Sequence, residues 1–157
     1  MHLWLKIVIC VFVVEGLGIA SGLLTASSIP TWYASLDRPP GNPPNWVFGP
    51  VWTGLYAMIG AAWALVWHLG DTTPGRTSAL AWFGVQLLLN LVWTPVFFGA
   101  NQIAAALAVI VALLVAIGLT IGKFHRLNRP AAMLLAPYFC WVGYATYLNA
   151  GYLVLNR

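Results

Sequence analysis

The sequence predicts an all-α membrane protein, a bundle of five transmembrane helices. Of its 157 residues, 61% are hydrophobic and only 6% are charged, whereas soluble domains carry about 25% charged residues. Several apolar runs reach the roughly 20 residues that a helix needs to cross a bilayer. Inside lipid the backbone must satisfy its own hydrogen bonds, and long unbroken runs do so as helices. We therefore expect one membrane domain over residues 1–157, without a soluble domain.

The expected helices span about residues 3–26, 46–69, 78–99, 102–122 and 130–153. The connection at 27–45 is too polar and too rich in proline to cross a membrane. GDTTPGRT at 70–77 is rich in turn-forming residues, GANQ at 99–102 is a polar corner, and KFHRLNRP at 123–130 is basic. Pro130 suits the first turn of a helix, where its missing amide proton costs little. These connections are short, so we expect consecutive helices to pack as antiparallel neighbours.

Basic residues in the connections predict the orientation of the bundle. Five spans place the termini on opposite sides, with five Lys and Arg residues on the amino-terminal side and two on the other: Lys6, Arg76, Lys123, Arg126 and Arg129 against Arg38 and Arg157. Because positive charge favours the inner side, we expect a cytoplasmic amino terminus and an external carboxyl terminus. The net charge of +4 is then an orientation signal and gives no case for nucleic-acid binding.

Aromatic and polar residues recur at helical spacing in three of the expected helices. The three stripes are Trp52, Tyr56, Trp63 and Trp67; Gln86, Asn90, Trp93 and Phe97; and Pro137, Trp141, Ala145, Leu148 and Tyr152. Such stripes are often core residues, and tryptophan also gathers at membrane interfaces. The tryptophans near span ends fit interface anchors: Trp4, Trp32, Trp46 and Trp67.

Gln86 and Asn90 lie within a span, where an amide exposed to hydrocarbon is costly. They must face a partner helix or a cavity. Hydrogen bonds between helices are common and contribute about 0.6 kcal/mol on average. The same face continues into Trp93 and Phe97, and these aromatic neighbours favour a cavity.

Glu15 lies near the middle of the first span, and an acid at that depth marks a functional site by default. Three interpretations stay open. The carboxyl group is protonated and bonded to a neighbouring helix, it contacts a ligand or proton, or it drives a small proton-coupled multidrug transporter. Such transporters are smaller four-helix proteins without a long proline-rich loop.

Two series of small residues predict close helix packing, within the bundle or between protomers. The fourth helix carries Ala104, Ala108, Ala112 and Ala116, and the first carries Gly18 and Gly22.

Three segments in order resemble the translocator-protein family (TspO/MBR), which includes the tryptophan-rich sensory proteins and the peripheral-type benzodiazepine receptors. They are WYASLDRPPGNPPNWVFGPVWTGLY at 32–56, QLLLNLVWTPVFFGANQ at 86–102 and PYFCWVGYATYLNAGY at 137–152. The resemblance covers nearly the whole chain and suggests a member of the bacterial type. Glu15 matches no family-wide ligand position.

The resemblance implies a bundle, usually a homodimer, whose proline-rich loop between helices 1 and 2 caps a ligand cavity. Its implied ligands are tetrapyrroles such as porphyrin and haem, isoquinoline or benzodiazepine drugs, and sterols such as cholesterol. The implied cavity contacts are Trp32, Tyr33, Trp52, Asn90, Trp93, Trp141, Ala145 and Leu148. The family's sterol motif is matched by Leu148, Tyr152 and Arg157, a weak pattern in membrane proteins. The implied location is a bacterial cell membrane.

The residues themselves suit a tetrapyrrole, a flat apolar disc with two carboxylates on one edge. Aromatic walls favour offset stacking, and the loop residues Arg38, Asn42 and Asn45 are placed to meet the carboxylates. Prolines restrict the loop beforehand, so ordering it over a ligand costs less entropy. Binding as a sensor or scavenger, transport, and light-dependent porphyrin degradation by Trp52 and Trp141 all remain open. None of these needs a metal or a resident cofactor.

Overall fold

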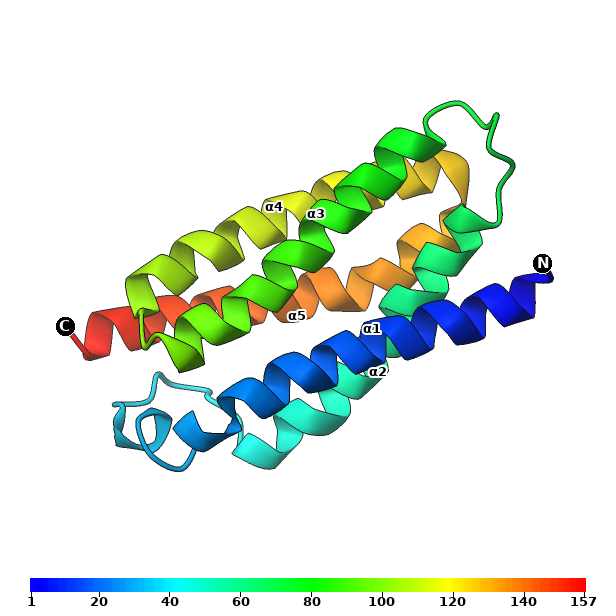
Figure 1. The fold of residues 1–157 in the computed structure, drawn as a ribbon. Coiled ribbons are helices and arrows are strands. Elements are labelled where there is room, and N and C mark those ends of the chain that lie inside the picture. The colour runs from blue at the N-terminus through cyan, green and yellow to red at the C-terminus, as the bar shows by residue number, and fades with distance from the viewer.

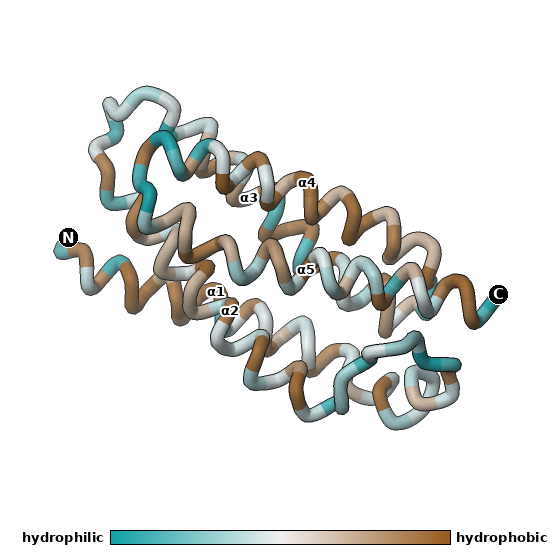
Figure 2. The backbone as a smooth tube through the Cα atoms, turned by 180° about the vertical axis from the view of Figure 1, so that it is seen from behind, coloured by the Kyte–Doolittle hydropathy of each residue, from teal (hydrophilic) through white to brown (hydrophobic).

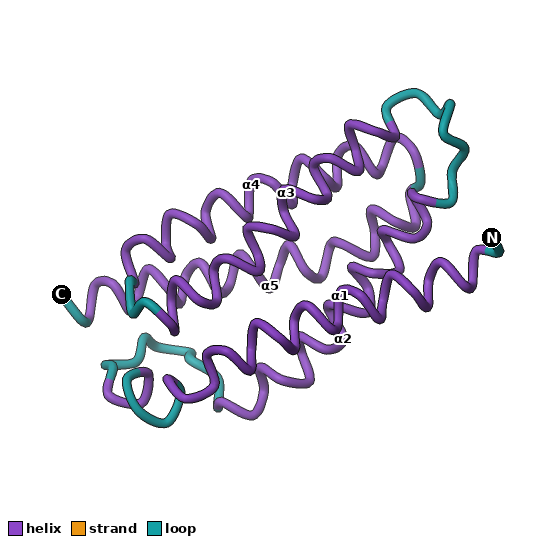
Figure 3. Tube along the Cα trace, viewed as in Figure 1, coloured by secondary structure: helices purple, strands orange, loops and turns teal.

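Five long helices make up most of the protein in the computed structural model, which describes residues 1–157 (Figure 1). They are α1 (Leu3–Thr25), α2 (Asn45–Trp67), α3 (Arg76–Thr94), α4 (Ile103–Leu127) and α5 (Arg129–Leu155). All five are long and apolar enough to cross a membrane, and helices and loops account for the whole trace (Figure 3). The predicted five-helix membrane bundle is confirmed.

The helices pack in the order α1, α2, α5, α4 and α3 around the bundle, with α3 returning to α1. Consecutive helices are close neighbours in three of the four expected pairs. The exception is α2, which packs more extensively on α5 than on α3. The connection between α2 and α3, residues 68–75, is long enough to carry the chain across the end of the bundle, as Figure 1 shows.

The connections gather at the two ends of the bundle. The amino terminus, the α2–α3 connection and the α4–α5 corner lie at one end, and the α1–α2 loop, the α3–α4 corner and the carboxyl terminus lie at the other (Figure 1). Many of the hydrophilic residues lie in these end segments (Figure 2). The termini therefore lie at opposite ends, as five spans require.

The predicted end of the fourth helix at residue 122 is wrong, because α4 continues through Leu127. The segment KFHRL contains no helix breaker, and its basic side chains favour the negative end of the helix dipole. Only Asn128 separates α4 from α5. Its Oδ1 accepts a hydrogen bond from the Ala131 N–H at 2.9 Å, which caps the new helix.

The third span ends in a π-helical turn, Pro95–Gly99 (η3), where the sequence predicts one continuous helix. Pro95 has no N–H, so the carbonyl of Leu91 loses its usual partner. Ser21 of α1 supplies a replacement, since its Oγ donates to the Leu91 oxygen at 3.5 Å. Asn101 then turns the chain in the left-handed conformation, with φ of 55°.

Small residues mark where the helices approach most closely. A Cβ on Gly60 would come 2.5 Å from the Cα of Val11, so α1 and α2 touch backbone to backbone there. On the alanine series of α4, Ala116 is buried, whereas the other three alanines are exposed on the outside of the bundle. Most of this series therefore does not serve packing within the protomer.

The half of the bundle away from the α1–α2 loop is filled by packed side chains. Phe83 stacks on Phe124, with ring centroids 6.0 Å apart, and on Trp63, at 5.5 Å. Trp63 also stacks on Trp67 at 6.2 Å. Trp63 and Trp67 of the predicted α2 stripe thus pack against other side chains, and only Trp52 and Tyr56 line open space.

Candidate functional site

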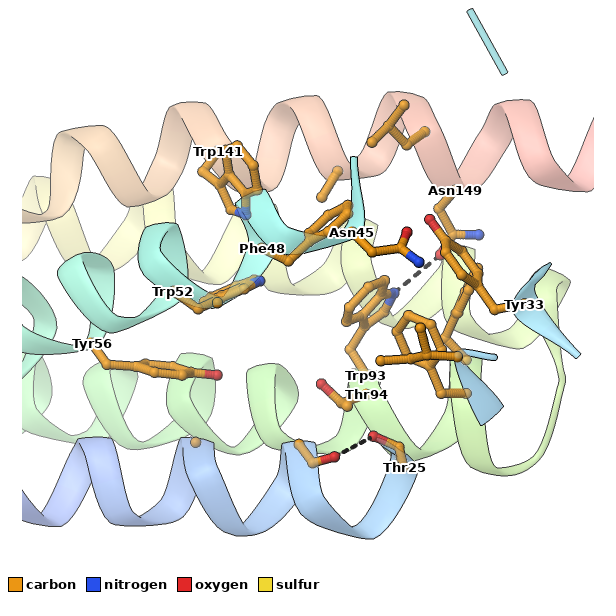
Figure 4. Close-up of a pocket in the computed structure, with 18 of the residues that line it drawn as sticks. Thr25, Tyr33, Asn45, Phe48, Trp52, Tyr56, Trp93, Thr94, Trp141 and Asn149 are labelled. Atoms are coloured by element: carbon orange, nitrogen blue, oxygen red, sulfur yellow. Dashed lines mark hydrogen bonds between the residues drawn. The ribbon is translucent and has the colours of Figure 1, made fainter. Parts of the chain in front are cut away.

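A cavity of about 380 Å³ occupies the half of the bundle that the α1–α2 loop covers. Helices α1, α2 and α5, the end of α3 and the loop all contribute to its lining. Figure 4 shows its aromatic side chains converging from α2, α3, α5 and the loop. Its wall residues are Glu15, Gly18, Ile19, Gly22, Thr25, Ile29, Tyr33, Asn42, Asn45, Phe48, Gly49, Trp52, Thr53, Tyr56, Trp93, Thr94, Phe97, Phe98, Trp141, Ala145, Leu148, Asn149 and Tyr152.

Paired rings build two of the cavity walls. On α2, Trp52 lies against Tyr56 with ring centroids 5.2 Å apart and an interplanar angle of 31°. At the end of α3, Trp93 stacks on Phe97 at 5.4 Å and 28°. Trp141 of α5 adds a third indole, and its buried Nε1 has no hydrogen-bond partner. These surfaces suit a flat aromatic ligand.

A chain of hydrogen bonds runs from the cavity wall into the core. Tyr56 donates its hydroxyl proton to Asn90 Oδ1 at 3.0 Å, and Asn90 Nδ2 donates to the Tyr138 hydroxyl at 3.0 Å. Tyr138 in turn donates to Gln86 Oε1 at 2.9 Å. Gln86 Nε2 is buried and has no partner. The network joins α2, α3 and α5 and fixes the ring of Tyr56.

A second polar pair fixes Trp93. Its Nε1 donates to Asn149 Oδ1 at 3.1 Å, and Asn149 Nδ2 donates to the carbonyl of Ile103 at 3.0 Å. The indole is therefore held between the start of α4 and the middle of α5. A wall ring that is fixed in this way costs less entropy to use in binding.

The α1–α2 loop is held onto α5 by side chains that contact its main chain. Asn156 accepts from the Asp37 N–H at 2.9 Å and donates to the Asp37 carbonyl at 3.0 Å. The Tyr147 hydroxyl donates to the Pro40 carbonyl at 3.0 Å. The three contacting pairs are Asn156 with Asp37, Tyr147 with Pro40, and Tyr144 with Gly41.

The same loop is seated on α5 by shape. Pro39 is buried against Gly151, and a Cβ on this glycine would come 2.5 Å from Pro39 Cβ. The Tyr152 hydroxyl donates to that of Tyr33 at 2.8 Å, and the Tyr33 hydroxyl lies 3.4 Å from Asn42 Oδ1, to which it donates. The loop therefore forms an ordered roof over the cavity.

Comparison with known proteins identifies the fold family. The family model described as the TspO/MBR family matches residues 9–155. The chain belongs to the TspO/MBR family. The "Tryptophan-rich protein TspO" of Chlorobaculum tepidum is 40% identical over 152 residues, which cover 97% of this chain and 96% of the relative. The human "Translocator protein" is 40% identical over 119 residues, covering 75% of this chain and 70% of the relative.

Most of the predicted ligand residues of this TspO/MBR protein line the one cavity. They are Tyr33, Asn42, Asn45, Trp52, Tyr56, Trp93, Phe97, Trp141, Ala145 and Leu148. Trp52 and Trp141, the predicted pair for light-dependent chemistry, come from α2 and α5 and are both in the wall (Figure 4). Their role as ligand contacts stays a prediction.

Five predicted residues of the family member lie outside the cavity wall: Trp32, Arg38, Gln86, Asn90 and Arg157. Gln86 and Asn90 form the hydrogen bonds between helices described above, so the interhelical alternative accounts for them. Trp32 packs edge-on against Phe97 at 5.6 Å. The guanidinium of Arg38 lies 5.9 Å from the centre of the Tyr33 ring. Arg157 is exposed beyond the end of α5.

Sequence reasoning missed several wall residues of this TspO/MBR protein. Asn149 carried the same signal as Asn90, a polar amide inside a span, and could have been found by it. Phe48 and Thr94 carried no such signal, because isolated aromatic and threonine residues are ordinary in membrane helices. Glu15 was singled out, and the structure places it in the cavity wall.

Proposed function

We propose that this TspO/MBR protein binds tetrapyrroles, porphyrin or haem, in the aromatic cavity beneath the α1–α2 loop. The single observation that carries the proposal is the convergence of three indoles, Trp52, Trp93 and Trp141, on one cavity of about 380 Å³. This volume falls within the range of small-molecule sites, about 300–1,000 Å³. Planar walls and an apolar interior match a planar apolar macrocycle.

The distribution of polar groups supports one orientation of the ligand. Asn42 and Asn45 line the loop end of the cavity. Arg38 lies outside the cavity wall, with its guanidinium over the ring of Tyr33, which is part of the wall. A porphyrin therefore enters with its two propionates toward the loop, where amide donors and one cation meet them.

The names of relatives support a role in sensing or in transport. The "Tryptophan-rich sensory protein" of Cereibacter sphaeroides is 40% identical over 125 residues, which cover 80% of this chain and 77% of the relative. The same apolar walls suit isoquinoline or benzodiazepine drugs and sterols. Of the sterol motif, Leu148 and Tyr152 line the cavity, whereas Arg157 does not.

Titration of the purified protein with protoporphyrin IX, followed by porphyrin absorbance and by tryptophan fluorescence, tests the proposal. The double variant Trp52→Phe/Trp141→Phe should lose most of the quenching and weaken the affinity. The matched control Trp4→Phe/Trp46→Phe also removes two indoles, both exposed, at 65% and 74%, and should bind like wild type. If both double variants retain wild-type affinity, the ligand does not occupy this cavity.

A light-dependent porphyrin-degrading reaction is a second candidate, favoured by the presence of Trp52 and Trp141 in the lining of one cavity. In it an indole passes an electron to the photoexcited porphyrin and regains it as dioxygen, the oxidant that is consumed, adds to the macrocycle and opens it. Illumination of the complex in air should give a new absorbing product that the dark sample and the oxygen-free sample lack. Flux of porphyrin into sealed vesicles separates transport from binding alone.

We also infer the arrangement in the membrane. Five basic residues at one end against two at the other favour a cytoplasmic amino terminus in a bacterial cell membrane. The exposed faces of Ala104, Ala108 and Ala112 on α4 suit close contact with a second copy in a homodimer. Reporter fusions at both termini test the orientation, and cysteine cross-linking along α4 tests the contact.

A further inference from the structure

One acidic side chain in the cavity wall has no role in tetrapyrrole binding. Glu15 is the only wall residue with a carboxyl group, and no lysine, arginine or histidine joins it there. The only ion pair of the protein, Arg76 with Asp71, lies in the α2–α3 connection at the other end of the bundle. Glu15 therefore has no cationic partner within the chain. A carboxyl group at this depth is costly unless something pairs with it.

The hydroxyl of Tyr56 offers the cavity an acceptor and no donor. A phenol has one proton, and Tyr56 gives it to Asn90 Oδ1 at 3.0 Å. Asn90 cannot return it, because its amide donates onward to Tyr138, which donates to Gln86. Because each hydrogen bond in this chain is donated away from Tyr56, toward Gln86, a lone pair on the Tyr56 hydroxyl oxygen stays available to a ligand.

Gly18 of α1 lets the ring of Tyr56, which belongs to α2, pack close to Glu15. It lies three residues after Glu15, on the same helical face. A Cβ at Gly18 would come 2.2 Å from Cε2 of Tyr56, so the tyrosine ring rests on the α1 backbone one turn from the acid. The indole of Trp52 lies beside that ring, 5.2 Å between centroids. The wall thus joins two oxygen acceptors to an aromatic face.

We propose that the cavity recognises flat aromatic ligands that carry a protonated amine. Glu15 and Tyr56 accept hydrogen bonds from the ammonium group, and the indole of Trp52 offers its face to the charge. An ammonium supplies the N–H donors and the positive charge that the oxygens of Glu15 and Tyr56 lack. The inference deepens the proposed function and rests on it in one respect, since both place the ligand in the same cavity.

Two probes with one ring system test the inference. Acridine is neutral at pH 7, and 9-(2-aminoethyl)acridine carries a protonated primary amine at that pH. Both are titrated against purified protein in a nonionic detergent, with tryptophan quenching as the readout. We expect wild type to bind 9-(2-aminoethyl)acridine about tenfold more tightly than acridine. Glu15→Gln should reduce this ratio to about one, by weakening the binding of the amine far more than that of acridine.

Asp71→Asn is the matched control, because it also removes one carboxylate, 93% exposed, from the other end of the bundle. It should keep the tenfold ratio, and Glu15→Asp should keep most of it. Equal wild-type affinities for the two probes overturn the inference, whether or not any variant folds. Equal weakening of both probes by Glu15→Gln, or loss of the ratio in Asp71→Asn, also overturns it.

The tetrapyrrole titration separates this inference from the proposed function. If protoporphyrin IX binds and the two acridines bind alike, only the ammonium site is wrong. If the ammonium preference holds and protoporphyrin IX does not bind, the cavity prefers amines and the tetrapyrrole proposal fails. If none of the three compounds binds, both proposals fail.

Discussion

Gly151 of α5 is the seat of the cavity roof, and replacing it by alanine tests that role directly. The new methyl would stand 2.5 Å from Cβ and 3.1 Å from Cγ of Pro39. Ordinary contacts at such a Cβ are 3.4–4 Å, so the loop must retreat by about 1 Å. Pro39 cannot turn away, because its ring is rigid.

The displacement also affects the hydrogen bonds beside the seat. The Tyr147 hydroxyl reaches the Pro40 carbonyl at 3.0 Å, and a retreat of this size stretches that bond beyond useful range. Inserting a methyl into a well-packed site costs about 1–3 kcal/mol. If this cost falls on the closed state of the loop, the opening equilibrium rises about 5- to 150-fold.

Hydrogen exchange of the loop amides measures that equilibrium without any ligand. The Asp37 amide is bonded to Asn156 Oδ1, across the contact between the loop and the end of α5, so it exchanges only when the roof opens. In protein held in lipid nanodiscs, Gly151→Ala should speed exchange in a peptide spanning 33–47 by about 5-fold or more, while helix peptides stay unchanged.

Gly143→Ala is the matched control on the same helix, because its Cβ would meet nothing within 4 Å. Both variants gain the roughly 1 kcal/mol by which alanine exceeds glycine in a helix, so their difference reports the collision alone. If the loop of Gly151→Ala exchanges at the rate found in Gly143→Ala, Pro39 does not seat the roof and the reasoning fails.

Three further variants probe the packing, the buried network and the cavity. Gly60→Ala places a methyl 2.5 Å from the Cα of Val11 and should lower the melting temperature in detergent by about 3–10 °C. Tyr138→Phe leaves the amide of Asn90 without an acceptor and should cost about 1–2 kcal/mol in an SDS unfolding titration. Ala145→Trp fills the cavity and should abolish binding of protoporphyrin IX by absorbance titration, with the melting temperature maintained.

Each of these variants has a control elsewhere in the chain. Gly54→Ala meets nothing within 4 Å and should melt at or above the wild-type temperature. Tyr147→Phe removes a hydroxyl that is exposed rather than buried and should cost less than Tyr138→Phe. Ala105→Trp adds the same indole on an exposed face of α4 and should leave binding intact. Equal effects in variant and control would contradict the structural reason given for that variant.

The positions of the five helices followed from composition, because apolar runs of spanning length leave the backbone one way to satisfy itself in lipid. The ends of the helices are predicted less accurately. The sequence predicts a basic connection after residue 122, yet Lys123 and Arg126 belong to the last turns of α4, and Lys123 Nζ donates to Ser78 Oγ at 2.9 Å. The hydroxyl that bonds to the Leu91 carbonyl before Pro95 comes from Ser21 of α1, a contact that no local pattern encodes.

The site was predictable where a single helix decides the outcome. An amide inside a span must avoid lipid, so the inward placement of Gln86 and Asn90 is confirmed. Their partner Tyr138 could not be predicted, because it depends on how α5 is rotated against α3. The α2 stripe predicted one face but not where along it the cavity lies, so Trp63 packs in the core while Trp52 lines the cavity.

The grip of α5 on the α1–α2 loop has a consequence for how binding specificity can change. The bonds that Asn156, Tyr147 and Tyr144 make to the loop all end on its main-chain atoms, and a main-chain carbonyl is the same for every residue type. Loop side chains other than those of Pro39 and Tyr33, which contact α5 themselves, can therefore be varied in a library while the roof stays docked. In this protein, most of the contacts that hold the loop in place are thus separate from the side chains that line the cavity.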